Sequence, residues 1–356
     1  MNKQYWSTRI RNIEPYVPGE QPKDRRYVKL NTNENPYPPS PKVEEAVRKV
    51  AMADLRLYPD PDCLALRSAL AEHMGLRPEQ VFVGNGSDEI LAFSYLAFMD
   101  GENPAIFPDI TYSFYPVYAA FFGNNTRIVP VNEDFTIPLE ELGKNDGTVV
   151  LTNPNAPTGI ALPLSDVEWV LRANPDHVVI VDEAYVDFGA QSAVGLIGQY
   201  ENLLVVQTCS KSRSLAGMRI GFAFGCESLI GALNAVKNSV NSYTLDRMAL
   251  AAAQAAVEDK AYMDDTCSRV SNTREITAGK LKKLGFTVLP SQANFLFAAH
   301  ERVPGAELFQ ALREKGVLVR YFNKPRIQNF LRITVGTPEE MDALIAALTE
   351  ILEEKA

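Results

Sequence analysis

The segment QTCSKSRSLAGMRIGFAFG, residues 207–225, places a single lysine, Lys211, among serines and small side chains. Arg213 and Arg219 follow it closely. A lysine in an exposed loop is normally solvated and unreactive, whereas a lysine that is partly removed from water has a lowered pKa and becomes a usable nucleophile. The segment therefore predicts either an ordinary charged loop or a reactive amine beside a bound anion.

Other polar side chains also follow apolar runs directly. The run VVIVD (178–182) ends on a carboxylate, and burying a carboxylate is costly unless it caps a helix or faces a cation. The turn NPNAPTG (153–159) carries two asparagines after TVVLT. Six side chains share this position after a strand: Asn155, Asp182, Tyr185, Ser210, Lys211 and Arg219. Together they predict a site for an aromatic cation, a phosphate and an aldehyde, the three features of pyridoxal phosphate (PLP).

The run VFVG (81–84) is followed by NGSDE (85–89), which opens a predicted helix. Free N–H groups at a helix N-terminus and small side chains favour a bound phosphate, and a simple capped turn is the alternative. Gly84 and Gly86 match the start of the dinucleotide motif G-x-G-x-x-G, but Glu89 stands in place of its third glycine. We therefore expect either a phosphate site or a simple capped turn here, and no dinucleotide site.

These residues need a framework of strands and helices. Seven short apolar runs predict strands, at 81–84, 105–108, 127–131, 148–152, 178–182, 203–208 and 219–225. Amphipathic segments such as 88–99 and 165–174 separate several of them. Runs rich in Val and Ile that alternate with helices predict an α/β fold, with a mostly parallel, mixed sheet covered by helices on both faces. Ligands of such sheets bind beyond the carboxyl ends of the strands.

The pattern changes near residue 255. A charged helix is predicted at 259–285, and four further apolar runs follow it, at 286–290, 294–300, 317–322 and 330–336. The prolines near the N-terminus favour an extended arm. We predict three parts: an arm, 1–30, that packs against the active site; a large domain, 31–254; and a smaller α+β domain, 255–356.

Composition excludes several functions for this chain of 356 residues. A net charge of −9 argues against nucleic-acid or anionic-membrane partners, which favour basic surfaces. No apolar run reaches membrane-spanning length, and the N-terminus is not a secretory signal. Four scattered cysteines, without a C-x-x-C pair, fit reduced thiols in a cytoplasmic protein. With three isolated histidines we expect no metal site.

Three motifs carry a family resemblance: N-P-N-A-P-T-G, V-D-E-A-Y and S-K-S-x-x-L-A-G-x-R-I-G. In this order and spacing they resemble the fold type I PLP-dependent aminotransferases, over nearly the whole chain. Five further segments resemble the histidinol-phosphate aminotransferase branch: E-P-Y-x-P-G (14–19), L-N-x-N-E-N-P (30–36), Y-P-D (58–60), G-V-L-V-R (316–320) and L-R-I-T-V-G (331–336). Aromatic aminotransferases and threonine-phosphate decarboxylases share some of these.

The resemblance implies a role for each matching residue. Lys211 would bond the cofactor aldehyde and then move a proton between the substrate α-carbon and the cofactor. Asp182 would pair with the pyridine nitrogen, whereas Tyr185 and Asn155 would hydrogen-bond the 3′-oxygen. Tyr112 would stack on the ring. Five residues would hold the phosphate: Gly86, Ser87, Asp88, Ser210 and Arg219. Arg213 has no role that we could derive.

The substrate pocket follows from the same resemblance. Arg332 matches the arginine that binds a substrate carboxylate, and a substrate phosphate can take that place. Arg320 would add a second guanidinium, because planar forks match phosphate oxygens well. Tyr16 and Asn33 would close the pocket from the arm. Tyr58 would reach the cofactor phosphate of a neighbouring subunit, which makes a homodimer part of the active site.

The implied reaction is amino-group transfer between histidinol phosphate and 2-oxoglutarate, giving imidazole-acetol phosphate and glutamate, as in histidine biosynthesis. Three alternatives stay open on the same scaffold. An aromatic amino-acid aminotransferase would also bind a flat ring and an anion. A threonine-phosphate decarboxylase would share the cofactor but release CO₂. A non-enzymatic PLP-binding regulator would need a separate DNA-binding segment, for which this acidic chain shows no candidate.

Overall fold

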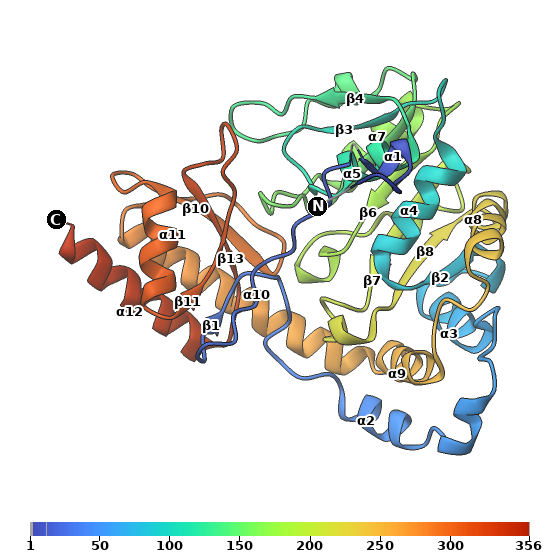
Figure 1. Ribbon diagram of the computed structural model, residues 1–356, viewed down its shortest axis with the longest axis horizontal. Coiled ribbons are helices and arrows are strands. Elements are labelled where there is room, and N and C mark those ends of the chain that lie inside the picture. Colours follow the sequence, from blue (N-terminus) through green and yellow to red (C-terminus); the bar gives the residue numbers. More distant parts are fainter. Residues whose placement is uncertain (1–2, 12, 356) are drawn as a thin grey trace.

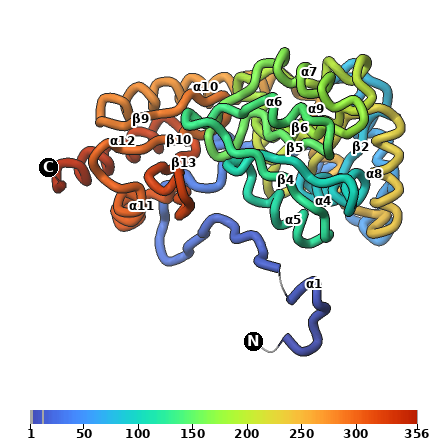
Figure 2. The backbone as a smooth tube through the Cα atoms, turned by 90° about the horizontal axis from the view of Figure 1, so that it is seen from above, coloured from blue at the N-terminus to red at the C-terminus, as the bar shows by residue number. Residues whose placement is uncertain are grey.

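The computed structural model describes residues 3–11 and 13–355. Positions 1, 2 and 12 of the predicted arm, and position 356 of the predicted smaller domain, lie outside the described residues. The arm contains a short helix, α1 (Thr8–Arg11), and becomes regular again at strand β1 (Val28–Lys29). Figure 2 shows that the arm runs beside the body of the protein and that α1 lies away from it.

The large sheet has seven strands in the order β2-β8-β7-β6-β5-β3-β4. Their bounds are β2 Val81–Gly84, β3 Ala105–Pro108, β4 Thr126–Val129, β5 Thr148–Thr152, β6 Val179–Asp182, β7 Leu203–Thr208 and β8 Gly221–Gly225. Strand β8 runs antiparallel to both of its neighbours, and the remaining pairs are parallel. The predicted strands and the mixed, mostly parallel sheet are therefore confirmed.

Helices cover both faces of this sheet (Figure 1). Alternate residues of one strand point to opposite faces, and in β6 Val179 and Val181 belong to one core cluster whereas Ile180 belongs to the other. One face packs against α3 (Leu64–Met74), α7 (Leu164–Ala173) and α9 (Arg247–Glu258), and the other against α4 (Gly86–Phe98), α5 (Tyr115–Phe122) and α8 (Glu227–Val240). Burial on both faces explains why these strands consist of continuous apolar runs.

A second, antiparallel sheet has the order β12-β13-β10-β9. It comprises β9 (Phe286–Val288), β10 (Phe295–His300), β12 (Arg320–Tyr321) and β13 (Phe330–Thr334). Its core packs against α10 (Lys260–Lys283), α11 (Gly305–Glu314) and α12 (Pro338–Glu354). The exact limits of the predicted domains stay a prediction.

The predicted strand at 317–322 is divided into two. Strand β11 (Val317–Leu318) pairs in parallel with β1 of the arm, whereas β12 pairs with β13. The chain therefore leaves one sheet and enters the other within a few residues. This change brings Arg320 directly opposite Arg332 in the β12–β13 ladder.

The remaining elements are short. They are α2 (Pro41–Arg48), α6 (Leu139–Leu142) and 3₁₀ turns at Met52–Arg56, Pro78–Gln80, Val186–Phe188, Ala193–Leu196 and Ala216–Met218. Across residues 3–11 and 13–355, no helix has both the length and the apolar character needed to cross a membrane.

Candidate active site

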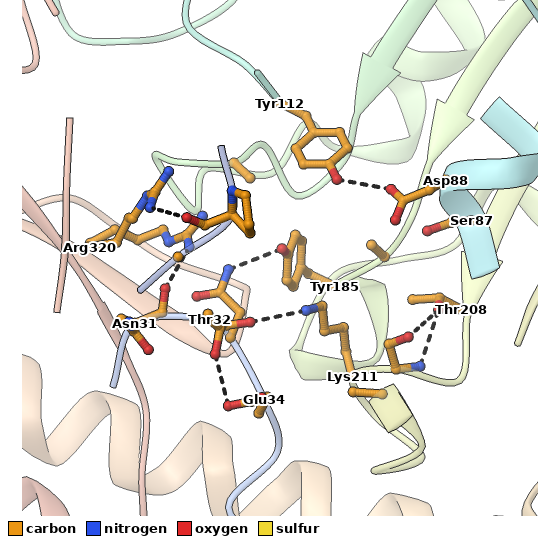
Figure 3. Close-up of a pocket in the computed structure, with 18 of the residues that line it drawn as sticks. Asn31, Thr32, Glu34, Ser87, Asp88, Tyr112, Tyr185, Thr208, Lys211 and Arg320 are labelled. Atoms are coloured by element: carbon orange, nitrogen blue, oxygen red, sulfur yellow. Dashed lines mark hydrogen bonds between the residues drawn. The ribbon is translucent and has the colours of Figure 1, made fainter. Parts of the chain in front are cut away.

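A cavity of about 510 Å³ lies where the carboxyl ends of the large-sheet strands meet the arm and the smaller sheet. Its walls come from segments far apart in the sequence, including the ends of β5, β6 and β7, the start of α4, and residues of β12 and β13. Most of the predicted site residues line it: Tyr16, Asn33, Ser87, Asp88, Tyr112, Asp182, Tyr185, Ser210, Lys211, Arg219, Arg320 and Arg332. Figure 3 shows this cavity with Lys211 and Tyr185 near its centre.

Lys211 enters the cavity from the loop that follows β7. Its Nζ lies 3.3 Å from the carbonyl oxygen of Thr32 and 5.8 Å from the centre of the Tyr185 ring. Burial, and then the nearby positive charge of Arg332, lower the pKa of Lys211 to about 8. About a tenth of this amine is therefore neutral at pH 7, far more than for a solvated lysine, and the neutral form is what a nucleophile or a base requires.

Asp182 ends strand β6 and is fully enclosed. Its Oδ2 accepts a hydrogen bond of 2.9 Å from the Tyr115 hydroxyl, and its Oδ1 accepts one of 3.3 Å from the Ala184 N–H. Burial raises the pKa of Asp182 to about 6, although these hydrogen bonds oppose the shift. A cation bound beside this carboxylate would lower the pKa again, so the site favours a positively charged group.

An anion cradle lies between the start of α4 and the lysine loop. The first N–H groups of a helix have no partner within the helix and carry its positive end. Gly86 has φ +79, and a Cβ there would lie 2.6 Å from Nη2 of Arg219. A Cβ at Gly221 would lie 2.4 Å from the Ser87 backbone nitrogen. Both positions therefore need glycine for the close approach of these elements.

Arg219 is held beside this cradle. It adopts a left-handed conformation with φ 56, and its Nη2 lies 3.2 Å from Oδ2 of Asp88. The other oxygen of Asp88 accepts a hydrogen bond of 2.9 Å from Tyr112. Ser210 completes the cradle from the lysine loop, and its N–H donates to the Thr208 hydroxyl at 3.1 Å.

Two arginines from the smaller sheet form the opposite wall. Nη2 of Arg332 donates to the carbonyl oxygen of Asn31 at 3.2 Å, and its buried Nε has no hydrogen-bond partner within the described chain. Nη1 and Nη2 of Arg320 reach the carbonyl oxygens of Pro18 and Val17 in the arm. Neither arginine forms an ion pair with a carboxylate among residues 3–11 and 13–355. Because like charges directly opposite each other on paired strands are destabilising, this wall is suited to a bound anion.

Tyr16 closes the cavity from the arm. Its ring stacks on Phe114 with centroids 4.7 Å apart and approaches Tyr112 at 6.3 Å. A planar substrate ring can pack against such a wall with little loss of conformational entropy.

Three predicted residues do not line the cavity: Gly86, which lies at the anion cradle described above, Asn155 and Tyr58. The amide nitrogen of Asn155 donates to the Ile110 carbonyl at 3.0 Å and to the Thr158 hydroxyl at 3.1 Å, and its Oδ1 accepts from the Thr111 hydroxyl at 2.9 Å, so its side chain is held by its own turn and by the segment after β3. Tyr58 lies on the surface, is 76% exposed, and stacks on Tyr243 with centroids 4.5 Å apart. The prediction that Tyr58 acts on a neighbouring subunit is not tested by a single chain.

Sequence reasoning missed several contacts to the predicted residues. Asn35 donates its amide to the carbonyl oxygens of Lys211 and Ser212, at 3.1 and 3.4 Å, and so supports the lysine loop. The N-T-N-E-N run of the arm was the available signal, but the resemblance drew attention to one of its asparagines only. Arg213 is buried, its Nη1 lies 3.6 Å from Oδ2 of Asp187, and it does not line the cavity, so it supports the fold of this loop.

The donor set fits PLP. A buried amine of lowered pKa suits an aldehyde, the Asp182 carboxylate suits a protonated ring nitrogen, and the cradle at α4 suits a phosphate. The unpaired Nε of Arg332 marks a place for a second anion on the substrate side. The fold and this set of residues together define a PLP-dependent transferase of fold type I.

Comparisons with known proteins agree. The sequence matches the family model for aminotransferase class I and II over residues 25–348. It is 58% identical to the histidinol-phosphate aminotransferase of Acinetobacter baumannii (strain AB0057), over 97% of each chain, and 54% identical to that of Clostridium beijerinckii, over 98% of this chain and 97% of the relative. The histidinol-phosphate aminotransferase of Sinorhizobium meliloti, solved in complex with pyridoxal-5′-phosphate, superposes with a TM-score of 0.88 at 26% identity over 99% of each chain.

The chain therefore belongs to the class I and II aminotransferases, within the histidinol-phosphate aminotransferase family. It is an enzyme, and its cofactor is pyridoxal phosphate.

Proposed function

We propose that this enzyme transfers an amino group between histidinol phosphate and 2-oxoglutarate, giving imidazole-acetol phosphate and glutamate, in the cytoplasm as a step of histidine biosynthesis. The observation that carries the choice of substrate is the pair Arg320 and Arg332. They stand directly opposite each other in the β12–β13 ladder, without an acidic partner among the described residues. A phosphate dianion matches two guanidinium groups better than a single carboxylate does.

PLP supplies a protonated ring that withdraws electrons from the carbon next to the transferred nitrogen. Asp182 holds the ring nitrogen in its protonated form, because its buried carboxylate has no other cation within contact in the described chain. The first turn of α4, with Ser210 and Arg219, holds the cofactor phosphate. Tyr185 donates its hydroxyl to the oxygen on the cofactor ring. Tyr112 packs on the face of the ring.

Lys211 carries the proton. Its neutral Nζ would bond the cofactor aldehyde carbon with release of water, and the incoming substrate amine would take over that bond and so free Nζ. The freed Nζ would be the group that takes the proton from the substrate carbon that bears the amine and passes it to the cofactor carbon. Its lowered pKa, near 8, leaves the amine able to accept and release a proton close to neutral pH.

The substrate lies between the cofactor and the arginine pair. Arg332 and Arg320 bind its phosphate, and Tyr16 packs against its imidazole ring. In the second half of the reaction, Arg332 binds a carboxylate of 2-oxoglutarate. Closing the site with the arm excludes water, which strengthens each of these charge interactions.

The proposal includes a homodimer. Tyr58 is exposed and stacks on Tyr243, and the same surface exposes Met52, Leu55 and Leu57. Exposed apolar side chains gathered in this way favour a protein interface. In the dimer, Tyr58 reaches the cofactor phosphate of the neighbouring subunit.

The test is a comparison of substrates. We expect kcat/KM with 2-oxoglutarate to be highest for histidinol phosphate, lower for phenylalanine and negligible for phosphothreonine. A higher kcat/KM for phenylalanine would make the protein an aromatic aminotransferase. Release of CO₂ from phosphothreonine would make it a decarboxylase.

A further inference from the structure

The hydroxyl oxygen of Tyr185 accepts a hydrogen bond from Asn33, and this contact determines which role is left to the hydroxyl proton. Tyr185 lies on the cavity wall, and its hydroxyl oxygen is 3.0 Å from Nδ2 of Asn33. An amide nitrogen donates and does not accept, so the tyrosine oxygen is the acceptor in this contact. Burial raises the pKa of the Tyr185 phenol, which therefore keeps its proton. That proton is left free to be donated to a different group.

The amide nitrogen of Asn33, and not its oxygen, faces Tyr185. The two ends are distinguished by their hydrogen-bond partners. The Asn33 backbone N–H donates to Oγ1 of Thr334 at 2.9 Å, and the same Thr334 hydroxyl donates to Oδ1 of Asn33 at 3.0 Å. If the amide were reversed, the Thr334 proton would lose its acceptor within the described chain. Thr334 therefore fixes Oδ1 toward itself and Nδ2 toward Tyr185.

The backbone holds Asn33 in this arrangement. Its φ is 54, in the left-handed region that asparagine tolerates better than most residues. Its carbonyl oxygen accepts a hydrogen bond of 3.0 Å from the amide of Asn294. The preceding residue, Thr32, accepts the hydrogen bond from Nζ of Lys211. The short segment 32–33, just after the arm, thus contacts both the reactive lysine and the tyrosine beside it.

We propose that Asn33 and Thr334 are positioning residues: they hold the Tyr185 hydroxyl with its proton directed into the cavity, where it donates to the oxygen on the cofactor ring. The inference rests on the proposed role of Tyr185. Sequence resemblance placed Asn33 at the substrate, whereas in the structure its side chain is hydrogen-bonded to Thr334 and Tyr185. Thr334, from the L-R-I-T-V-G motif, had no predicted role.

The test is a pH titration of the visible absorbance of the bound cofactor, in holoenzyme without substrate. A hydroxyl that donates to the ring oxygen stabilises its anionic form, and so lowers the midpoint at which the cofactor bound to Lys211 takes up a proton. Thr334→Val removes the hydroxyl but keeps the shape of the side chain. We expect it to raise the midpoint by about one pH unit, the size of one oriented hydrogen bond. Thr334→Ser keeps the hydroxyl and should keep the wild-type midpoint.

A double-substitution cycle separates positioning from a general structural effect. Tyr185→Phe should raise the midpoint at least as much as Thr334→Val, and adding Thr334→Val in the Tyr185→Phe background should change nothing further. A wild-type midpoint in Thr334→Val, or an equal further shift in that background, would overturn the inference. A wild-type midpoint in Tyr185→Phe would instead overturn the proposed role of Tyr185.

A second variant covers the case in which Thr334→Val does not fold. Asn33→Asp is nearly isosteric, keeps a residue type that tolerates the left-handed backbone, and replaces the amide donor by a carboxylate oxygen. That oxygen would accept the Tyr185 proton and turn it away from the cavity. The same upward shift is expected, and an unchanged midpoint would overturn the inference.

Discussion

Replacing Arg320 with methionine should reduce kcat/KM for histidinol phosphate far more than kcat/KM for phenylalanine. Methionine keeps much of the volume of the side chain and removes only the guanidinium. In the structure Arg320 and Arg332 are paired residues of neighbouring strands, so one dianion can contact both. A hydrogen bond to a charged group contributes about 1.5 to 3 kcal/mol, which corresponds to a roughly 10- to 150-fold loss for the phosphate substrate.

The carboxylate of phenylalanine needs Arg332 alone. In Arg320→Met, the loss in kcat/KM for phenylalanine should stay within about 1 kcal/mol, or roughly fivefold, because Arg320 contributes only a partly exposed contact to this substrate. Arg320 also donates to the carbonyl oxygens of Val17 and Pro18, and any loosening of the arm would affect both substrates equally. The ratio of the two kcat/KM values therefore isolates the phosphate contact.

Arg326→Met is the matched control. Arg326 lies near Arg320 in sequence, but its guanidinium donates to the carbonyl oxygens of Val131 and Asn132 and pairs with Asp109, outside the active-site cavity. It should leave the substrate ratio unchanged. Steady-state kinetics with both substrates at saturating 2-oxoglutarate measure these values. Equal losses for histidinol phosphate and phenylalanine in Arg320→Met would refute the assignment of the phosphate to this arginine pair.

Three further predictions follow from the site. Lys211→Ala should abolish the absorbance band of the cofactor bonded to the protein, and a surviving band would refute the role of Lys211. In the wild-type apoprotein, the rate at which the cofactor bonds to the protein should rise as the pH increases through about 8, because Lys211 loses its proton there. As the pH rises from roughly 4 to 6, the apoprotein should lose up to about 3 kcal/mol of stability, because folding raises the pKa of Asp182 to about 6 and so favours its protonated form. Asp182→Asn should remove this loss in a pH series of thermal unfolding curves and should also weaken cofactor binding. An unchanged pH dependence would contradict the burial of an unpaired carboxylate. The Tyr58→Phe enzyme and the Lys211→Ala enzyme should each be poorly active alone. A mixed dimer should regain activity at one site, because there the Tyr58→Phe subunit supplies Lys211 and the Lys211→Ala subunit supplies Tyr58. No gain in activity on mixing would show that Tyr58 does not act across an interface.

Much of the fold was predictable because its strands are buried on both faces. Such strands form continuous runs of Val and Ile that stand out from the helical segments between them. The position of Lys211 and Asp182 also followed, since the carboxyl ends of parallel strands meet at one edge of the sheet. Which of the residues at these strand ends lie next to each other is then decided by the order of the strands in the sheet.

Other features depend on contacts that leave no trace in local spacing. Asn33 and Thr334 are hydrogen-bonded although they are 301 positions apart. The direction of the Asn155 amide depends on Ile110 and Thr111, more than 40 positions earlier, as well as on Thr158 in its own turn, and a sequence shows only that an asparagine is present. The run at 317–322 has the composition of one strand, and only the pairing of β11 with the arm divides it.

The most direct measurement of the central claim follows the cofactor through a single turnover. Purified holoenzyme is mixed with one equivalent of histidinol phosphate, without 2-oxoglutarate, and the absorbance band of the bound cofactor is recorded. We predict that the band is lost as the amino group passes to the cofactor, and that adding 2-oxoglutarate restores it with release of glutamate. A band that persists with histidinol phosphate but disappears with phenylalanine would contradict the proposed function.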